Sequence, residues 1–204
     1  MQNTEIKKEP APSAGLFNQI IAVTNRRLCT RPFLEQIERV CRLHPRALIL
    51  REKDLPEEEY SLLFSQVLEI CGRYQVPCIC HTYYQAAKAA GSRQIHLPLP
   101  ILRSLQDTDV LNDFDGIGVS VHSADEARLA ASLGASYLTA GHIFQTDCKK
   151  GLPPRGLDFL EEVCQSVSIP VYAIGGIQAD AAQLSLIQSR GAAGGCIMSG
   201  MMRI

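Results

Sequence analysis

The stretch GIGVSVHSADEARLAASLGASYLTA, residues 116–140, holds one complete unit of the fold. A β-branched run comes first, an amphipathic helical pattern follows, and a second strand-like run closes the stretch. Ser123 and Glu126 form a capping box, in which Ser123 bonds the amide three residues on and Glu126 reaches back. The helix is therefore expected to begin at Ser123, and His122 then stands at the exit of the first strand.

The same unit recurs along the chain. Strands are expected at 20–24, 47–51, 76–81, 94–97, 116–121, 136–140, 170–174 and 194–198, and helices at 32–43, 56–73, 83–90, 100–106, 124–133, 157–166 and 180–188. Alternating strands and helices favour a parallel sheet with right-handed crossovers. Eight strands in this arrangement predict a (β/α)8 TIM barrel. A Rossmann-type open sheet is the alternative, but no Gly-x-Gly-x-x-Gly follows the first strand. Little chain follows the last strand, so the last helix is expected to be missing or shortened.

Composition narrows the class of protein. With 204 residues and 46% hydrophobic content, we expect a flexible N-terminal tail over 1–15 and a single barrel domain over 16–204. The net charge of −1 and the lack of a basic stripe argue against a nucleic-acid surface. No run approaches the roughly 20 apolar residues of a membrane helix, and the N-terminus has no apolar signal core. A soluble, cytoplasmic protein is expected.

The eight cysteines are expected to be free thiols. Most lie in apolar patterns such as VPCIC and GGCIM, where cysteine behaves as a small hydrophobe. Cys78 and Cys80 are separated by one residue and lack the second pair that a structural zinc site needs. We therefore expect neither a metal nor a cofactor.

The active site of such a barrel lies at the carboxyl ends of the strands. Period-2 alternation after the second strand directs Arg51 and Lys53 to one side and Glu52 away from them. Asp54 is expected to cap the helix that follows. The sequence thus predicts a cationic pair at this strand exit.

Four of the five histidines, at positions 81, 96, 122 and 142, lie near predicted strand ends. Rim histidines often only bond backbone, so position alone assigns no role. His122 is the best acid–base candidate, because imidazole titrates near neutral pH and no carboxylate pair at strand ends competes with it. Cys148, next to Lys149, is a weaker candidate for a nucleophile.

Two glycine turns follow the last two predicted strands. AIGGIQ contains Gly175 and Gly176, and MSG closes the final strand. Alone, each is no more than a tight turn, but barrels often bind phosphate through backbone amides after strands seven and eight. Arg51, Lys53, Lys149 and Lys150 would add positive charge, although each cation by itself is more often a solvated surface residue. Together these features predict a site for an anionic substrate.

Several motifs carry a family resemblance over nearly the whole barrel. They are LREKDL (50–55), VSVHS (119–123), GHIFQTDCKKG (141–151), IPVYAIGGI (169–177) and MSG (198–200). In these motifs the sequence resembles the thiamin phosphate synthase superfamily, and more closely its TenI branch, the thiazole tautomerases. The loop GHIFQTDCKKG is the motif that is nearer to the tautomerases.

The sequence departs from the synthase pattern where synthases hold magnesium. The resemblance implies an Asn-Asp pair at the end of strand three and an acidic residue after strand four, but here these places read His81-Thr82 and HLPLPILRS. A glutamine that synthases use near the pyrimidine is Ile49 here. Since Mg²⁺ needs oxygen ligands, the tautomerase is the favoured interpretation.

For a tautomerase the resemblance implies a cofactor-free isomerisation in thiamin biosynthesis. A 2-carboxy-4-methylthiazol-5(2H)-ylidene ethyl phosphate becomes its aromatic carboxythiazole isomer by a proton shift, with His122 as the base, the acid or both. The glycine turns would hold the phosphate, and the loop after strand six would contact the substrate carboxylate. The substrate-binding residues carried over are Arg51, Lys53, Ser120, Thr146, Cys148, Lys149, Gly175, Gly176, Met198, Ser199 and Gly200.

Two alternatives stay open. One is a thiamin phosphate synthase, which requires magnesium-dependent condensation with a pyrimidine diphosphate. The other is a non-catalytic, phosphate-ligand-binding regulatory paralogue, against which the pair Ser120-x-His122 argues, because a binding protein needs no acid–base group. The expected partner is a small phosphorylated thiazole, with no nucleic acid and no membrane, and the sequence leaves a homodimer open.

Overall fold

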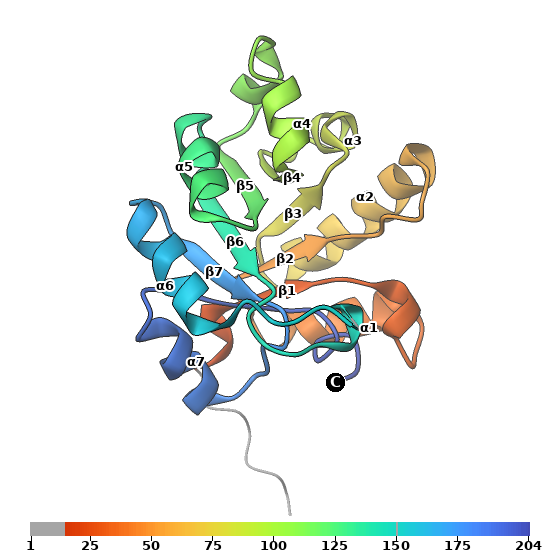
Figure 1. The fold of residues 1–204 in the computed structure, drawn as a ribbon. Coiled ribbons are helices and arrows are strands. Elements are labelled where there is room, and N and C mark those ends of the chain that lie inside the picture. The colour runs from red at the N-terminus through yellow and green to blue at the C-terminus, as the bar shows by residue number, and fades with distance from the viewer. Residues whose placement is uncertain (1–14, 150) are drawn as a thin grey trace, which may run out of the picture.

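Eight parallel strands close into a barrel in the computed structural model of the chain, which describes residues 15–149 and 151–204 (Figure 1). The strands are β1 (Ile20–Val23), β2 (Ala47–Leu50), β3 (Cys78–His81), β4 (Gln94–Pro98), β5 (Gly116–Val121), β6 (Tyr137–Gly141), β7 (Val171–Ile174) and β8 (Gly194–Ile197). The barrel closes where Ile21 of β1 pairs with Cys196 of β8. The predicted (β/α)8 barrel is confirmed, and the open-sheet alternative is wrong.

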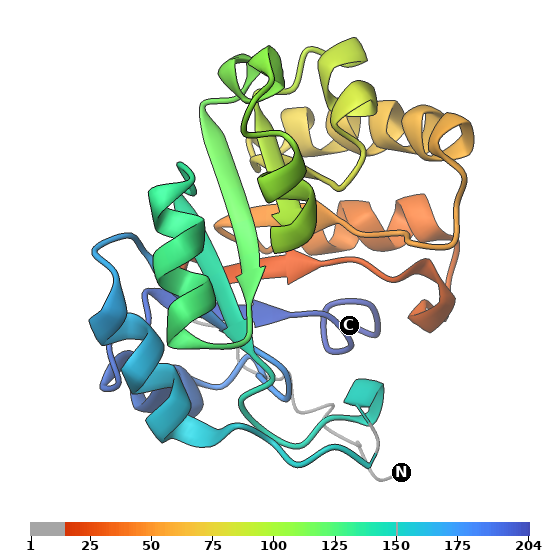
Figure 2. The ribbon, with the colours of Figure 1, turned by 45° about the horizontal axis from the view of Figure 1, so that its top comes forward.

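The helices lie outside the barrel and follow its strands in turn (Figure 2). They are α1 (Phe33–Cys41), α2 (Glu57–Arg73), α3 (Tyr84–Ala89), α4 (Leu99–Ser104), α5 (Ala124–Ser132), α6 (Gly156–Ser166) and α7 (Ala181–Gln188), with 3-10 turns η1 (Phe17–Gln19), η2 (Arg26–Leu28), η3 (Asp109–Asp113) and η4 (Asp147–Lys149). Within the described part of the chain no helix follows β8, as expected for a barrel whose last helix is missing. None of the described helices is long and apolar enough to span a membrane. The predicted tail over 1–15 lies outside the described residues except for Gly15.

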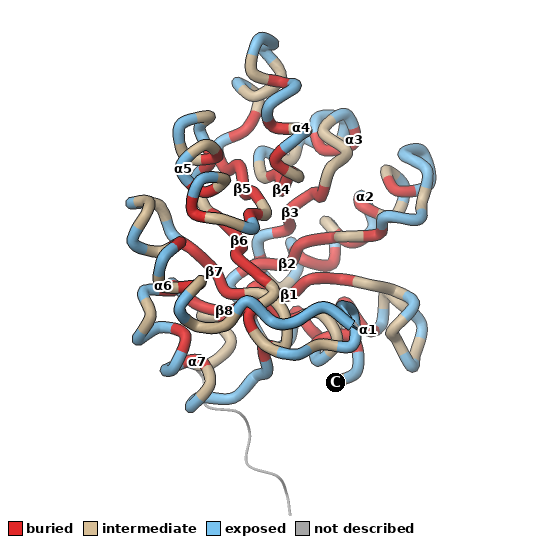
Figure 3. Tube along the Cα trace, viewed as in Figure 1, coloured by how far each residue is buried: buried red, intermediate tan, exposed pale blue. Residues whose placement is uncertain are grey.

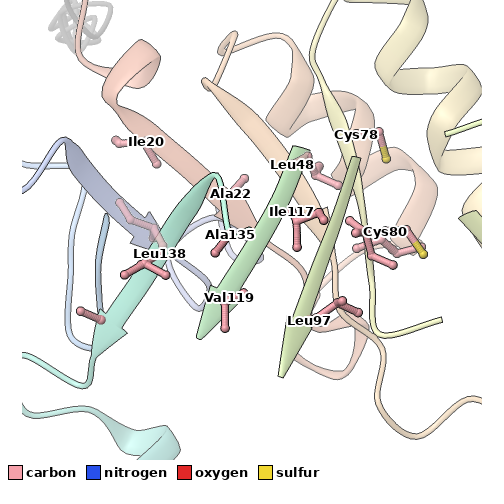
Figure 4. Close-up of a cluster of buried hydrophobic side chains, with 14 of the residues drawn as sticks. Ile20, Ala22, Leu48, Cys78, Cys80, Leu97, Ile117, Val119, Ala135 and Leu138 are labelled. Carbon is pink, nitrogen blue, oxygen red and sulfur yellow. The ribbon is translucent and has the colours of Figure 1, made fainter. Parts of the chain in front are cut away.

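Strand alternation divides the buried side chains into two layers. Residues such as Ile20, Ala22 and Leu48 pack outward with apolar helix residues in the large cluster between strands and helices (Figure 4). Residues such as Ile21 and Ile49 point inward and form a smaller cluster inside the barrel. The strands are accordingly the most continuously buried segments of the chain, and exposed residues lie on the outer helix faces and loops (Figure 3).

The eight cysteines, all within the described residues, are free thiols as predicted. Five of them are buried, namely Cys41, Cys71, Cys78, Cys80 and Cys196, and Cys148 is exposed. Burial raises the pKa of the Cys196 thiol inside the barrel. These five side chains serve as small hydrophobic groups.

The start of α5 follows the predicted cap with one difference. Ser123 Oγ accepts a hydrogen bond from the Glu126 amide at 3.1 Å, as expected. The Glu126 carboxylate, however, accepts from the amide of His122 at 2.6 Å, which is one residue before the cap. The helix start therefore holds the backbone of His122 directly.

The predicted Asp54 cap of α2 is wrong. The helix begins after Pro56 and has no side-chain cap. Asp54 instead forms ion pairs with Arg26 at 2.6 Å and with Arg27 at 2.7 Å. The Arg26 guanidinium donates to both carboxylate oxygens of Asp54, and such a charge-assisted fork is stronger than a hydrogen bond to one amide.

Candidate functional site

A cavity of about 1180 Å³ opens at the carboxyl ends of the strands. Every residue that the sequence assigned to the site lines it: Arg51, Lys53, Ser120, His122, Thr146, Cys148, Lys149, Gly175, Gly176, Met198, Ser199 and Gly200. These residues come from the ends of β2, β5, β6, β7 and β8. The barrel thus gathers them at one mouth, and what each does there stays a prediction.

A buried carboxylate fixes the exit of β2. Glu52 is only 2% exposed and faces away from the cavity, as alternation predicted. It accepts hydrogen bonds from Thr24 Oγ1 at 2.6 Å and from the Arg26 amide at 3.0 Å. Thr24 Oγ1 in turn accepts from the Arg51 amide at 2.9 Å. The exits of β1 and β2 are tied together, and Arg51 is held toward the cavity.

The cationic side of the cavity has no ion pair among the described residues, although the negative charge of Glu52 acts on Arg51. Arg51 is half-buried, and its guanidinium has no hydrogen bond or ion pair with residues 15–149 or 151–204. Burial lowers the pKa of Arg51. Burial also lowers the pKa of Lys53, and the nearby charges of Arg51 and Lys149 lower it further. A bound anion would relieve this mutual repulsion.

The His122 ring has one nitrogen occupied by the backbone. Its Nδ1 lies 3.0 Å from the carbonyl oxygen of Gly141. A carbonyl oxygen only accepts, so Nδ1 carries the hydrogen and donates it. In the neutral ring Nε2 is then the unprotonated nitrogen, which is the tautomer that a general base needs.

The two glycine turns lie at the ends of β7 and β8 and contain free amides. Gly175 and Gly176 have φ of 96° and 72°, which is the left-handed region that favours glycine. The amides of Gly176, Ser199 and Gly200 donate to no backbone acceptor in the described part of the chain. Free backbone amides at glycine turns are groups that can bind an anion.

The loop after β6 extends from the barrel toward the turn after β8 (Figures 1 and 2). Its two ends are joined, because the Arg155 amide donates to the carbonyl of His142 at 3.0 Å. At its tip, Cys148 Sγ lies 3.9 Å from Ser199 Oγ. The loop therefore brings Thr146, Cys148 and Lys149 to the part of the cavity that Ser199 lines. Lys150 lies outside the described residues.

Sequence reasoning left the buried histidines without a role. His81 and His96 are 6% and 2% exposed, and their rings stack with centroids 5.7 Å apart. Burial lowers the pKa of His81 to about 2 and that of His96 to about 3, so both are neutral at physiological pH. His96 hydrogen-bonds Ser120 and Tyr137, a contact set across three strands. The sequence signal that could have pointed to this contact is the period-2 alternation of β5 and β6, which turns Ser120 and Tyr137 into the barrel.

The strand ends at which synthases were expected to hold magnesium carry no carboxylate in this chain. Among the described residues no group of three or more histidine, cysteine, aspartate or glutamate side chains could hold a metal. The strand ends at which synthases were expected to carry acidic ligands hold neutral His81 and Pro98, close to the charges of Arg51 and Lys53. Magnesium requires oxygen ligands, and positive neighbours oppose it.

Comparison with known proteins gives a family match over most of the chain. The model of the family described as thiamine monophosphate synthase matches residues 20–201. Thiamine-phosphate synthase 2 of Streptococcus pneumoniae serotype 4 is 31% identical over 191 residues, which cover 91% of this chain and 88% of that protein. Putative thiamine-phosphate synthase 2 of Aquifex aeolicus is 33% identical over 159 residues, covering 78% and 85%.

Solved structures agree with the fold. Thiamine phosphate pyrophosphorylase from Pyrococcus furiosus superposes with a TM-score of 0.76 at 27% identity, covering 92% of this chain and 89% of that one. FabK from Thermotoga maritima has a TM-score of 0.65 at 15% identity and is similar in fold alone. The two relatives and the Pyrococcus structure described above are named as synthases or a pyrophosphorylase, and none of these three names mentions a tautomerase.

Proposed function

The chain belongs to the thiamine monophosphate synthase family, and from that premise we propose that it is a thiazole tautomerase of thiamin biosynthesis. The proposed reaction converts 2-carboxy-4-methylthiazol-5(2H)-ylidene ethyl phosphate to its aromatic carboxythiazole isomer. The observation that carries the proposal is the hydrogen bond from His122 Nδ1 to the Gly141 oxygen, 3.0 Å, which leaves Nε2 free to accept a proton at the cavity.

The proposed chemistry needs one base and no cofactor. His122 Nε2 takes the proton from ring carbon 2, and the electron pair of that C–H bond becomes the double bond from carbon 2 to the ring nitrogen. The ring C=N bond shifts to carbons 4 and 5, and the exocyclic double bond opens to accept a proton on its outer carbon. His122 returns that proton, so substrate and product have the same composition.

Two charged regions of the cavity match the two anionic ends of this substrate. The free amides of Gly176, Ser199 and Gly200 support binding of the phosphate. Arg51 and Lys53, which have no anion of their own among the described residues, support binding of the carboxylate. Holding both ends would fix ring carbon 2 beside His122.

Thiamine-phosphate synthase is the second candidate function, and the names of the relatives favour it. That reaction would use the same cationic side of the cavity for a pyrimidine diphosphate. The strand ends at which synthases were expected to bind magnesium for this condensation carry no carboxylate here. The residues of the site therefore favour the tautomerase, although family membership alone does not.

One pair of assays separates the two candidates. Purified protein is incubated with the ylidene phosphate without metal, and separately with the aromatic thiazole phosphate, the pyrimidine diphosphate and excess Mg²⁺. We expect faster aromatisation than in buffer and no thiamine phosphate. Thiamine phosphate formation together with an unaccelerated isomerisation would establish the synthase instead.

A further inference from the structure

A chain of hydrogen bonds crosses the barrel interior behind the cavity. It joins the Tyr137 hydroxyl of β6 to His96 Nδ1 of β4 at 3.0 Å, and His96 Nε2 to Ser120 Oγ of β5 at 2.8 Å. Thr139 Oγ1 donates to the same Ser120 oxygen at 3.1 Å. A side chain at Gly118 would collide with the Tyr137 ring, so this glycine provides the space that the chain of hydrogen bonds occupies.

The direction of these bonds follows from the first group in the chain. Tyr137 as a residue is only partly buried, but desolvation raises the pKa of its hydroxyl well above the usual value, so the hydroxyl keeps its proton. Its one hydrogen-bond partner within the described ranges is His96 Nδ1. A hydroxyl in such surroundings donates rather than leave its hydrogen without an acceptor. His96 Nδ1 is then the acceptor.

The protonation state of His96 fixes the direction of its hydrogen bond to Ser120. The ring is neutral because burial lowers its pKa to about 3, so it carries one hydrogen. With Nδ1 accepting, that hydrogen is on Nε2 and is donated to Ser120 Oγ. Stacking on His81 at an interplanar angle of 17° limits rotation of the ring.

The Thr139 hydroxyl is buried and has no other acceptor among the described residues, so it donates to Ser120 Oγ. With His96 donating as well, both lone pairs of Ser120 Oγ are occupied. Its own hydrogen has no acceptor left in the barrel interior, and Ser120 lines the cavity. We infer that Ser120 is a fixed hydrogen-bond donor to the bound ligand, and that His96 and Tyr137 are positioning residues that set this direction.

A serine that only donates restricts which ligand atoms it can bind. The ligand atom facing Ser120 must be an acceptor without a hydrogen, such as a carboxylate or phosphate oxygen or an unprotonated ring nitrogen. Ser120 has no lone pair left to act as a base or nucleophile. For the ylidene phosphate the identity of the acceptor rests on the proposed function, but the direction of the internal bonds does not.

The ligand-free protein tests the direction first. Long-range ¹H–¹⁵N NMR of ¹⁵N-histidine protein reports which ring nitrogen carries hydrogen, and the His96→Gln spectrum assigns the His96 signals. We expect a neutral His96 ring with hydrogen on Nε2 throughout pH 6 to 8. Hydrogen on Nδ1, or a doubly protonated ring, would overturn the inference whatever reaction the protein catalyses.

Kinetics then test whether Tyr137 acts through Ser120. Ser120→Ala is expected to lower kcat/KM for isomerisation by about 10-fold, as for loss of one hydrogen bond to a charged group. Tyr137→Phe should lower it by several-fold, yet cause no further loss in the Ser120→Ala background. Tyr172→Phe is the matched control, because Tyr172 is 3% exposed and packs against Tyr137 without bonding His96.

The outcomes of the kinetic test are distinct. Equal losses from Tyr137→Phe in both backgrounds, or the same loss from Tyr172→Phe, would show a general packing effect and contradict a positioning role. If wild-type protein does not accelerate the isomerisation, the proposed function fails, and the double-mutant cycle is run instead on the affinity for the aromatic carboxythiazole phosphate by calorimetry. Coupling of the two variants there supports the inference independently.

Discussion

At the scale of single residues, Arg51 combines partial burial with the lack of an ion pair among the described residues. Its guanidinium is half-buried and has no ion pair within the described part of the chain, and burial lowers its pKa. A half-buried charge without an ion pair is expected to reduce stability and to be available to an anionic ligand. Replacing this residue is therefore expected to weaken ligand binding without lowering the stability of the fold.

The variant Arg51→Met tests this expectation. Loss of a charge-assisted hydrogen bond should raise KM for the ylidene phosphate by about 10-fold or more, while the free energy of unfolding stays the same or rises. Steady-state kinetics and urea unfolding measure the two quantities. Arg73→Met is the matched control, since Arg73 is exposed on α2 and pairs with Glu69. A lower unfolding free energy together with an unchanged KM would contradict the assigned role.

Residue placement was predictable from the sequence where it depends on local alternation. The opposite directions of Arg51 and Glu52 followed from period 2 alone, and so did the grouping of strand-end residues at one mouth. The bonds of Ser120 did not follow, because its partners His96 and Thr139 lie on two other strands, 24 and 19 residues away. Such contacts depend on the register between strands, which the sequence pattern does not give.

At the scale of elements, the turn after β7 packs tightly against the loop after β6. The Phe144 amide donates to the Gly175 carbonyl at 2.9 Å. A Cβ at Gly176 would lie 2.6 Å from the carbonyl oxygen of Gln145. The turn that presents the free amides therefore also positions the loop that carries Thr146 and Cys148.

Gly176→Ala should disturb both elements. The residue has φ of 72°, and alanine there is strained and collides with the loop. We expect the free energy of unfolding to fall by about 1–3 kcal/mol and the affinity for inorganic phosphate to fall by about 10-fold. Gly91→Ala is the control, because Gly91 has a similar φ of 66° with open space around its Cβ. If both variants bind phosphate equally well, the turn is not the phosphate site.

Elements were predicted well in order and less well at their ends. Each predicted strand and helix exists, and α2 and β5 have nearly the predicted bounds. Asp54 failed as a cap because Arg26, 28 residues earlier, provides a better partner than the helix amides. Glu126 accepts from the amide of His122 and not from that of the cap residue Ser123. Capping rules assume that no stronger partner competes.

At the scale of the whole molecule, the barrel interior contains two neutral histidines. In the unfolded chain both ionise near their usual pKa of about 6.5, whereas in the folded protein their pKa values are about 2 and 3. Between about pH 3 and 6.5 the unfolded chain therefore binds more protons, and the free energy of unfolding falls as the pH falls. Each histidine contributes up to about 2 kcal/mol of this loss between pH 7 and 5.

His96→Gln should reduce the pH dependence of stability. Urea unfolding at pH 7, 6 and 5 is expected to show that the variant loses about 2 kcal/mol less than the wild type over this range, because one of the two proton uptakes on unfolding is removed. The exposed His44 is the control position, and His44→Gln should keep the wild-type slope. Parallel curves for wild type and His96→Gln would show that His96 is not held neutral by folding.

The central claim is that His122 carries a proton for a thiazole isomerisation, and its most direct test is the initial rate of aromatic product formation from the ylidene phosphate. Wild-type protein should exceed the rate in buffer, and His122→Asn should be slower than wild type by about 10²- to 10⁴-fold. His44→Asn, at an exposed position away from the cavity, should retain the wild-type rate. Wild-type protein no faster than buffer, or His122→Asn as fast as wild type, would contradict the account.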